Sequence, residues 1–251
     1  MTHTYSNEFY DYIEKGSRRS AKAFIAILQN SLDLNSVLDV GCGRGAWLSE
    51  WRAAGIEDVI GVDGDYVIRE NLHFPPEQFC PANLEQGFDL DRKFDLAQCL
   101  EVAEHLREEA AKVIVQSIAR HSNIVVFSAA TPGQGGENHI NEQPISYWRE
   151  IFEQNGFEAY DFVRPNVQAD DQVEPWYRYN TLLYANALGR RKLSKEIINT
   201  HIPKGMPIVE YGSLGWKMRK AVVRTLPRVL VNKIAAVNAA RLVHQAKKSV
   251  T

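Results

Sequence analysis

The stretch from Ser36 to Asp63 constrains the fold more than any other part of the chain. A short apolar run, Val37–Val40, leads directly into three glycines within the five residues Gly41–Gly45, and an amphipathic segment follows at once. A second apolar run, Val59–Val62, then ends at Asp63. This order predicts a strand, a tight glycine turn, a helix and a second strand.

The glycine turn indicates a ligand site. Glycines at a strand-to-helix junction turn the backbone tightly, and because they lack a Cβ they let a ligand approach closely. The N–H groups at the start of the following helix then face that ligand. Asp63 lies 22 residues after Gly41, where an acid typically accepts hydrogen bonds from the ribose hydroxyls of a bound nucleoside.

The turn is compatible with two ligand classes. Gly41-x-Gly43-x-x-Ala46 satisfies the pattern of dinucleotide-binding turns, so NAD is one candidate. Asp39 argues against it, since a carboxylate two residues before the first glycine repels a pyrophosphate and suits an ammonium group. The form Asp39-x-Gly41-x-Gly43-x-Gly45 with the later Asp63 resembles the class I S-adenosylmethionine (SAM)-dependent methyltransferases. SAM carries a sulfonium and an ammonium and no phosphate.

This resemblance implies that SAM is the cofactor, that the glycine turn wraps its methionine part, and that Asp63 holds its ribose. The family usually has an Asp-Leu pair after the third strand, whereas this chain has Asn83-Leu84. An Asn side-chain oxygen can still accept a hydrogen bond from the adenine amino group. The predicted cofactor-binding residues are Asp39, Gly41, Cys42, Gly43, Gly45, Asp63, Gly64, Asn83, Leu84, Leu100 and Glu101.

A second part of the resemblance lies at the end of the apolar strand predicted over residues 94–100. Glu101-x-x-Glu104-His105 follows it, a frequent form in the family beside the transferable methyl group. Ligands of open parallel sheets bind at the carboxyl ends of the strands. We therefore expect Glu101, Glu104 and His105 to lie close to the chemistry.

Two histidines are the candidate catalytic residues, since a hydroxyl acceptor benefits from a general base and imidazole suits that role near neutral pH. His139 is the first choice, because it lies in the glycine-rich loop after the predicted fifth strand, among acidic neighbours such as Glu142. His105 is the second. The predicted substrate-binding residues are Glu142, Trp176 and Tyr177, the last two in a long connection over residues 164–180. A homodimer contact is the alternative role for that connection.

The same residues allow a different interpretation. Glu101, Glu104, His105 and His139 are similar to the set with which small-RNA 2′-O-methyltransferases bind a divalent metal. The Glu-x-x-Glu-His form is also widespread in relatives without a metal. The prediction is therefore of no metal, with a metal-dependent 2′-O-methyltransferase as an alternative.

Composition bounds the remaining possibilities. At 251 residues with a hydrophobic fraction of 45%, the chain suits one sizeable α/β domain with appendages. Three widely spaced cysteines form neither a disulfide framework nor a zinc pattern. The sequence shows no secretion signal and no run of 18 apolar residues, so we expect a cytoplasmic protein without a membrane span.

The C-terminal segment is strongly basic. All 31 Asp and Glu residues lie at or before Glu210, whereas nine of the 29 Lys and Arg residues follow it. A cationic amphipathic helix of this kind suits an anionic membrane surface at the inner face of the membrane, the acidic body of the protein, or a partner subunit. Nucleic acid is not favoured, because the predicted active-site loops are acidic.

These observations combine into one prediction. The resemblance implies a three-layer, Rossmann-like α/β methyltransferase fold with a seven-stranded, mostly parallel sheet whose last strand is antiparallel. We expect an N-terminal helical cap over residues 1–35, the SAM-dependent methyltransferase domain over 36–190, and a linker with a basic amphipathic helical extension over 191–251. The expected activity is O-methylation of a small-molecule or sugar-containing (glycan) acceptor. The alternatives are small-molecule N-methylation and a catalytically silent SAM-fold scaffold that docks on a membrane-bound glycan or lipid assembly.

Overall fold

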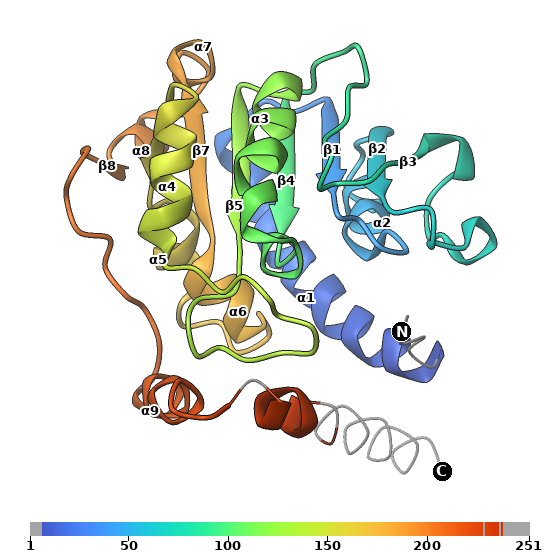
Figure 1. Cartoon of the computed structure of the whole chain (residues 1–251). Coiled ribbons are helices and arrows are strands. Elements are labelled where there is room, and N and C mark those ends of the chain that lie inside the picture. Colours follow the sequence, from blue (N-terminus) through green and yellow to red (C-terminus); the bar gives the residue numbers. More distant parts are fainter. Residues whose placement is uncertain (1–6, 228, 236, 238–251) are drawn as a thin grey trace.

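The protein forms a three-layer α/β structure around one sheet (Figure 1). The computed structural model describes residues 7–227, 229–235 and 237, with side chains from residue 14 onward. The predicted extension therefore lies partly outside the described residues, as do the first residues of the predicted cap. The strands are β1 (Ser36–Val40), β2 (Asp58–Asp63), β3 (Phe79–Pro81), β4 (Leu96–Leu100), β5 (Ile124–Ser128), β6 (Phe157–Tyr160), β7 (Leu182–Asn186) and β8 (His201–Ile202).

The strand order is β3-β2-β1-β4-β5-β7-β6-β8. The pairs from β3 to β5 are parallel, while β7 is antiparallel to both β5 and β6. This confirms the mostly parallel sheet and the antiparallel seventh strand. The predicted count of seven strands is wrong by one, because the two-residue β8 pairs antiparallel with β6. Two residues are too few to produce an alternating pattern in a sequence.

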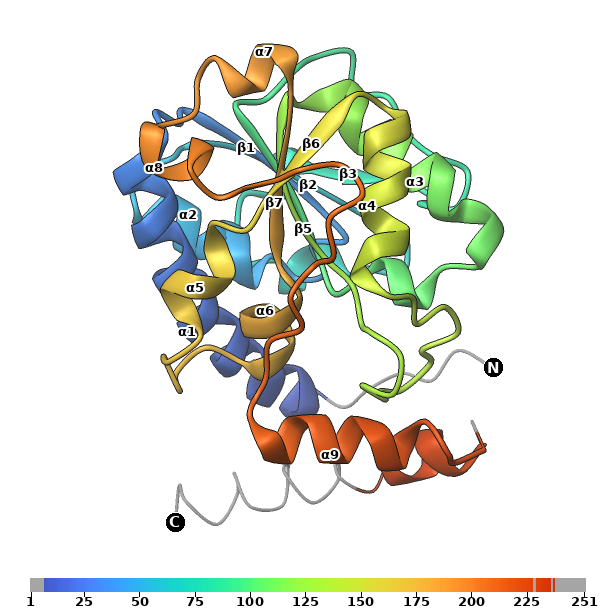
Figure 2. The same ribbon diagram turned by 90° about the vertical axis from the view of Figure 1, so that its left-hand side faces the viewer.

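Helices cover both faces of the sheet. The α-helices are α1 (Asn7–Ser31), α2 (Ala46–Ala53), α3 (Ala111–His121), α4 (Ile145–Gln154), α5 (Val163–Val167), α6 (Pro175–Asn180), α7 (Ala187–Arg190), α8 (Lys195–Ile198) and α9 (Leu214–Val223). The 3-10 helices are η1 (Arg69–Asn71), η2 (Pro76–Gln78), η3 (Ala103–His105) and η4 (Glu108–Ala110). Figure 2 shows α1, α2 and α5 on one side of the sheet and α3 and α4 on the other.

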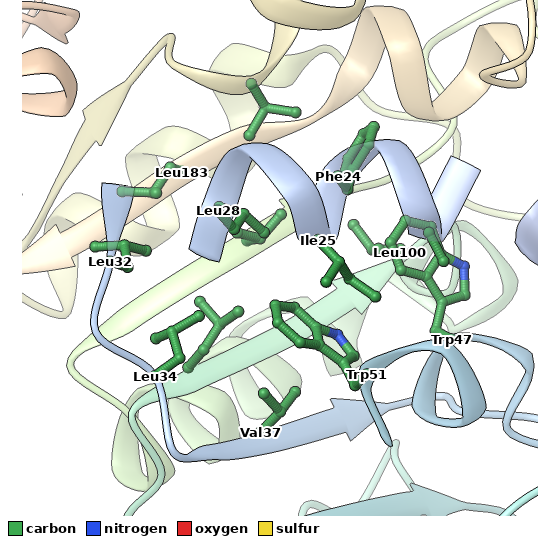
Figure 3. Packing of buried hydrophobic residues seen from close by; sticks show 14 of the residues in the cluster. Phe24, Ile25, Leu28, Leu32, Leu34, Val37, Trp47, Trp51, Leu100 and Leu183 are labelled. Atoms are coloured by element: carbon green, nitrogen blue, oxygen red, sulfur yellow. The ribbon is translucent and has the colours of Figure 1, made fainter. Parts of the chain in front are cut away.

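The long helix α1 belongs to the main hydrophobic core. Its buried residues recur at helical spacing and contact the sheet and α2, as Figure 3 shows for Phe24, Ile25 and Leu28 beside Trp47 and Trp51. Phe24 has no exposed surface, and its ring meets Trp47 edge-on at 5.4 Å between centroids. The predicted N-terminal cap therefore packs into the same core as the strands.

One segment differs from the sequence-based expectation. The connection over residues 164–180, expected as a long loop, contains the short helix α6 and most of α5. Part of the basic segment forms α9, which lies on the side of the sheet where β4 and β5 end, beneath α6 and the loop over residues 129–144 (Figures 1 and 2). In the part of the chain that the structure describes, no helix is both long and apolar enough to cross a membrane.

Candidate active site

The glycine turn between β1 and α2 has the conformation that its sequence requires. Gly41, Gly43 and Gly45 have φ angles of 80°, 53° and 83°, in the left-handed region that favours glycine. A Cβ on Gly41 would lie 2.3 Å from a methyl carbon of Val102, so this position also lacks space. A Cβ on Gly43, in contrast, would meet no atom within 4 Å. The backbone at Gly43 is therefore open to a ligand.

Asp63, the last residue of β2, faces this turn. Its Oδ2 accepts a hydrogen bond from the Gly43 N–H at 2.7 Å. Its Oδ1 accepts from the Gly64 N–H at 2.7 Å and from the Tyr66 hydroxyl at 2.5 Å. The carboxylate thus lies beside the open backbone of Gly43, where the sequence predicts a ribose.

Asp39 lies on β1 beneath the turn and is 4% exposed. Burial raises the pKa of its carboxyl to about 7, and the nearby charge of Asp63 acts in the same direction, while a hydrogen bond with Gln98 opposes both. A buried acid with a raised pKa is stabilised in its charged form by a cation. The ammonium group of SAM is such a cation, so the residues present fit this cofactor.

The remaining predicted cofactor residues surround the same strand ends. Leu84 and Leu100 are buried, whereas Asn83 is exposed, and its side-chain oxygen accepts a hydrogen bond from the Glu85 N–H at 3.0 Å. Cys42 is 8% exposed, and burial together with neighbouring carboxylates raises the pKa of its thiol. A neutral thiol is a poor nucleophile, which agrees with a packing role for Cys42.

Glu101 holds a polar network at the end of β4. Its φ of 57° is unusual for a residue with a Cβ, and such backbone strain is concentrated at functional sites. Its carboxylate accepts hydrogen bonds from the side-chain amides of Gln134 at 2.6 Å and Asn180 at 3.4 Å, and these two amides are themselves linked at 2.7 Å. Burial raises the pKa of Glu101. Sequence reasoning missed Gln134 and Asn180.

The loop after β5 brings His139 to the same place. The N–H groups of Ile140 and Asn141 donate to the carbonyl oxygen of Glu104 at 2.9 and 3.0 Å, which fixes the loop against the end of β4. The His139 side chain is 12% exposed, and its Nδ1 lies 2.9 Å from Oε1 of Glu142. Its ring also meets the His105 ring edge-on, with centroids 4.9 Å apart.

Glu142, predicted to bind substrate, supports His139 and the glycine-rich loop, and its contact with a substrate stays a prediction. Besides contacting His139, it accepts hydrogen bonds from the N–H groups of Gly133 at 2.8 Å and Gly135 at 2.7 Å. Burial alone would raise the pKa of Glu142, but these hydrogen bonds and the His139 ring outweigh it and lower the pKa. An ionised Glu142 orients the ring with Nδ1–H toward the carboxylate, which leaves Nε2 to accept a proton.

Glu104, His105 and His139 form a compact group with ligand atoms within 4.8 Å of one another. Glu104 is 1% exposed, and neither carboxylate oxygen has a hydrogen-bond partner among the described residues. Burial and the adjacent charge of Glu101 raise the pKa of Glu104. Although His105 is exposed as a residue, desolvation of its ring and the nearby His139 lower its pKa to about 4. Protonation of Glu104, or a cation bound to these three residues, would neutralise the buried carboxylate and remove the free-energy cost of burying its charge.

The other two predicted substrate residues lie on α6. Tyr177 is buried, its hydroxyl lies 3.2 Å from the Ser17 hydroxyl, and its ring meets Trp47 edge-on at 5.2 Å between centroids. Trp176 is half-buried and packs beside Tyr177. These two residues therefore contribute to the aromatic core, and their contact with an acceptor stays a prediction.

Comparisons with known proteins agree with this geometry. A family model described as a methyltransferase domain matches residues 11–161. A comparison with curated proteins gave no match.

Several solved structures are similar in fold. DesVI from Streptomyces venezuelae has a TM-score of 0.55 at 15% identity, covering 71% of this chain and 95% of DesVI. The sugar N-methyltransferase KedS8 from a Streptoalloteichus species has a TM-score of 0.54 at 18% identity, covering 74% and 97%. Magnesium protoporphyrin IX methyltransferase from Synechocystis, solved with bound SAM, has a TM-score of 0.52 at 20% identity, covering 73% and 86%.

At these identities the solved structures show the fold alone. The family match has a wider meaning, because it spans more than half of the chain and includes the glycine turn, Asp63 and the Glu101–His105 segment. The chain therefore belongs to the methyltransferase domain family and is a SAM-dependent methyltransferase.

Proposed function

We propose that the protein methylates an oxygen of a small or sugar-containing acceptor, with His139 as the general base. The observation that carries this proposal is the contact between His139 and Glu142. Hydrogen bonds between the loop and the carbonyl oxygen of Glu104 hold this pair at the end of β4. When bound, SAM would supply a methyl group on a positively charged sulfur, and S-adenosylhomocysteine would be the leaving group as the bond between sulfur and methyl breaks. As the acceptor oxygen gains the methyl carbon, the hydroxyl proton passes to Nε2 of His139, and Glu142 stabilises the resulting imidazolium.

A histidine base supports oxygen over nitrogen as the methylated atom. A hydroxyl must lose its proton during transfer, whereas a neutral amine attacks through its free lone pair. N-methylation of a cationic amine in an aromatic pocket also has less support, since Tyr177 packs within the core against Trp47. N-methylation remains the alternative that product analysis distinguishes directly.

The test is methyl transfer to candidate hydroxylated acceptors by variants at His139. For His139→Ala we expect a fall in turnover of about 10²–10⁴-fold, the usual contribution of a general base. SAM binding, measured by calorimetry, should be unchanged. His201→Ala, on the edge strand β8, is the matched control. Normal turnover by His139→Ala would remove the assignment of the base.

Metal-assisted 2′-O-methylation is a second candidate, favoured by the unpaired carboxylate of Glu104 beside two imidazoles. Carboxylate and imidazole donors together suit a divalent cation of borderline softness. Full activity after exhaustive chelation would exclude this candidate. Loss of activity on chelation with recovery on adding Mn²⁺ or Mg²⁺ would favour it over metal-free transfer.

The silent-scaffold alternative predicts binding without turnover. SAM and S-adenosylhomocysteine would both raise the melting temperature by mass action, and no acceptor in a cell extract would gain a methyl group. A cytoplasmic location and a peripheral membrane contact also stay proposals. The second is supported by the outer side of α9, where Leu214, Met218 and Val222 are 60–75% exposed.

A further inference from the structure

The C-terminal extension is fixed to the loop that carries His139. Arg219 donates from Nη1 to the carbonyl oxygen of Gln134 at 2.7 Å, and Arg224 donates from Nε to that of Pro132 at 2.7 Å. Lys220 is 4% exposed, and its ammonium contacts the Thr131 hydroxyl at 3.2 Å and forms an ion pair with Glu210. Arg219 and Lys220 of α9, and Arg224 directly after it, thus contact the protein's own loop.

The glycines of the loop permit this close approach. A Cβ on Gly133 would lie 2.4 Å from the carbonyl oxygen of Lys220. A Cβ on Gly135 would lie 3.1 Å and 3.2 Å from methyl carbons of Val231 and Val223. The two glycines therefore allow the loop backbone to pack closely against α9 and the residues that follow it.

A cavity of about 250 Å³ lies between the loop and the extension. This is slightly smaller than the roughly 300–1,000 Å³ of pockets for drug-sized ligands, so it suits a small acceptor. Pro132, Gly133, Gly136, His139 and Glu142 line it from the loop. Val223, Arg224, Leu226, Val231 and Asn232 line it from the extension, and we call these five residues the C-terminal wall.

The charges around the cavity indicate what it binds. Glu142 already accepts two backbone hydrogen bonds and contacts His139. Arg224 forms no ion pair among the described residues, and Glu210, the carboxylate whose pKa its charge helps to lower, is paired with Lys220. Besides its hydrogen bond to Pro132, Arg224 therefore offers a positive charge to a ligand. Three apolar side chains of the C-terminal wall offer surface to the ligand's carbon skeleton. An anionic group next to a compact carbon skeleton fits this combination.

We propose that the C-terminal wall completes the acceptor site and that Arg224 binds an anionic group, a carboxylate or a phosphate, of a hydroxylated acceptor. The hydroxyl to be methylated then faces His139, which lines the same cavity. This inference rests on the proposed O-methylation, and it identifies the acceptor class as an acidic sugar or a comparable hydroxylated anion.

The proposal is tested by measuring how three small probes bind to the full chain saturated with S-adenosylhomocysteine. The probes are D-glucuronate, glucose 6-phosphate and uncharged glucose. We expect at least one anionic probe to bind ten or more times more tightly than glucose, and the two anions distinguish a carboxylate from a phosphate. Arg224→Gln should remove this preference, and Arg224→Lys should restore part of it. Val223→Phe, which fills the cavity, should weaken binding of every probe.

Two variants on the same helix serve as controls. Lys217→Gln removes one exposed charge, and Ala221→Phe introduces the same side chain as Val223→Phe at an exposed position. Both should bind the probes as the unaltered protein does, and all variants should keep their SAM-induced shift in melting temperature. Equal binding of the anions and glucose, or an unchanged preference in Arg224→Gln, would overturn the proposal.

The outcome also separates this inference from the proposed function. If turnover of a hydroxylated acceptor requires His139 while Arg224→Gln and Val223→Phe leave its KM unchanged, the C-terminal wall is not part of the acceptor site. If probe binding follows Arg224 but no hydroxyl is methylated, the wall binds anions and the proposed O-methylation is wrong.

Discussion

The buried carboxyl of Asp39 makes binding of the cofactor sensitive to pH. Its pKa of about 7 means that below this pH the protonated form predominates in the free protein. The ammonium of SAM favours the carboxylate, so binding releases a proton and the affinity rises as the pH increases toward 7. Calorimetry at about pH 6, in buffers of different protonation enthalpy, should detect this proton release. Asp39→Asn should bind SAM more weakly and release no proton; an equal release by this variant would exclude Asp39 as its source.

Gly136 is expected to control the position of the His139 ring. A Cβ at this position would lie 2.2 Å from Nε2 of His139, so Gly136→Ala must displace the imidazole. A misplacement of about 1 Å costs roughly 10²-fold in rate. We expect kcat to fall by that order with unchanged SAM binding. Gly215→Ala, whose Cβ meets no atom within 4 Å, should leave kcat unaltered. Equal rates for both variants would show that the ring position does not matter.

At individual positions, the sequence revealed candidate residues but not their contacts. It placed acidic residues beside His139, but only the structure shows that Glu142 is the one that contacts the ring. The loop has no periodicity, so no pattern indicates which side chain faces which neighbour. Gln134 and Asn180 are 46 residues apart in the chain, and a contact over that separation leaves no local signal. The one available hint was the polar Asn180, two residues before the buried strand β7.

Among the elements, α1 is expected to unfold together with the sheet. Phe24 is fully buried between α1 and α2, and removal of such a ring typically costs about 3–5 kcal/mol. Phe24→Ala should therefore lower the free energy of unfolding by this amount in one cooperative transition, measured in urea. Lys22→Ala, at an exposed position of the same helix, should change it by less than about 0.5 kcal/mol. A separate early transition for α1 would contradict a shared core.

Elements with a long or strongly apolar pattern were predictable, and short ones were not. The buried strands β1, β4 and β5 and the long helix α1 all stand out by composition or spacing. The helices α5 and α6 have five and six residues, which is less than two turns and too short to show an apolar face. Their stability comes from contacts with α1 and with each other, which a local pattern does not report.

For the whole molecule, the amphipathic extension has two faces with different expected partners. One face binds the loop that carries His139, while Leu214, Met218 and Val222 point outward at helical spacing. We expect the protein to bind vesicles that contain phosphatidylglycerol but not vesicles of phosphatidylcholine alone. Sedimentation should show that this binding disappears between roughly 0.05 M and 0.5 M salt.

Variants of the outward face make this expectation specific. Met218→Asp should abolish vesicle binding, whereas Leu188→Asp, at an equally exposed apolar residue on α7, should not. Binding that survives high salt or Met218→Asp would contradict it. The sequence alone could not assign the two faces, because a basic amphipathic helix shows the same pattern whether it contacts a membrane or its own protein.

The hydrogen bonds of Asp63 have a consequence for how the protein discriminates between nucleosides. The carboxylate already accepts from two backbone N–H groups and from the hydroxyl of Tyr66. A carboxylate has about four acceptor positions, so a ribose diol would have to replace the Tyr66 hydroxyl in order to use both of its own. The exchange with Tyr66 conserves the number of hydrogen bonds, and the second ribose hydroxyl adds one at the remaining acceptor position. A nucleoside with one hydroxyl missing would use only that remaining position and leave the hydrogen bond from Tyr66 in place. Because Tyr66 already occupies one acceptor position in the free protein, the second hydroxyl of the ribose adds little to the affinity.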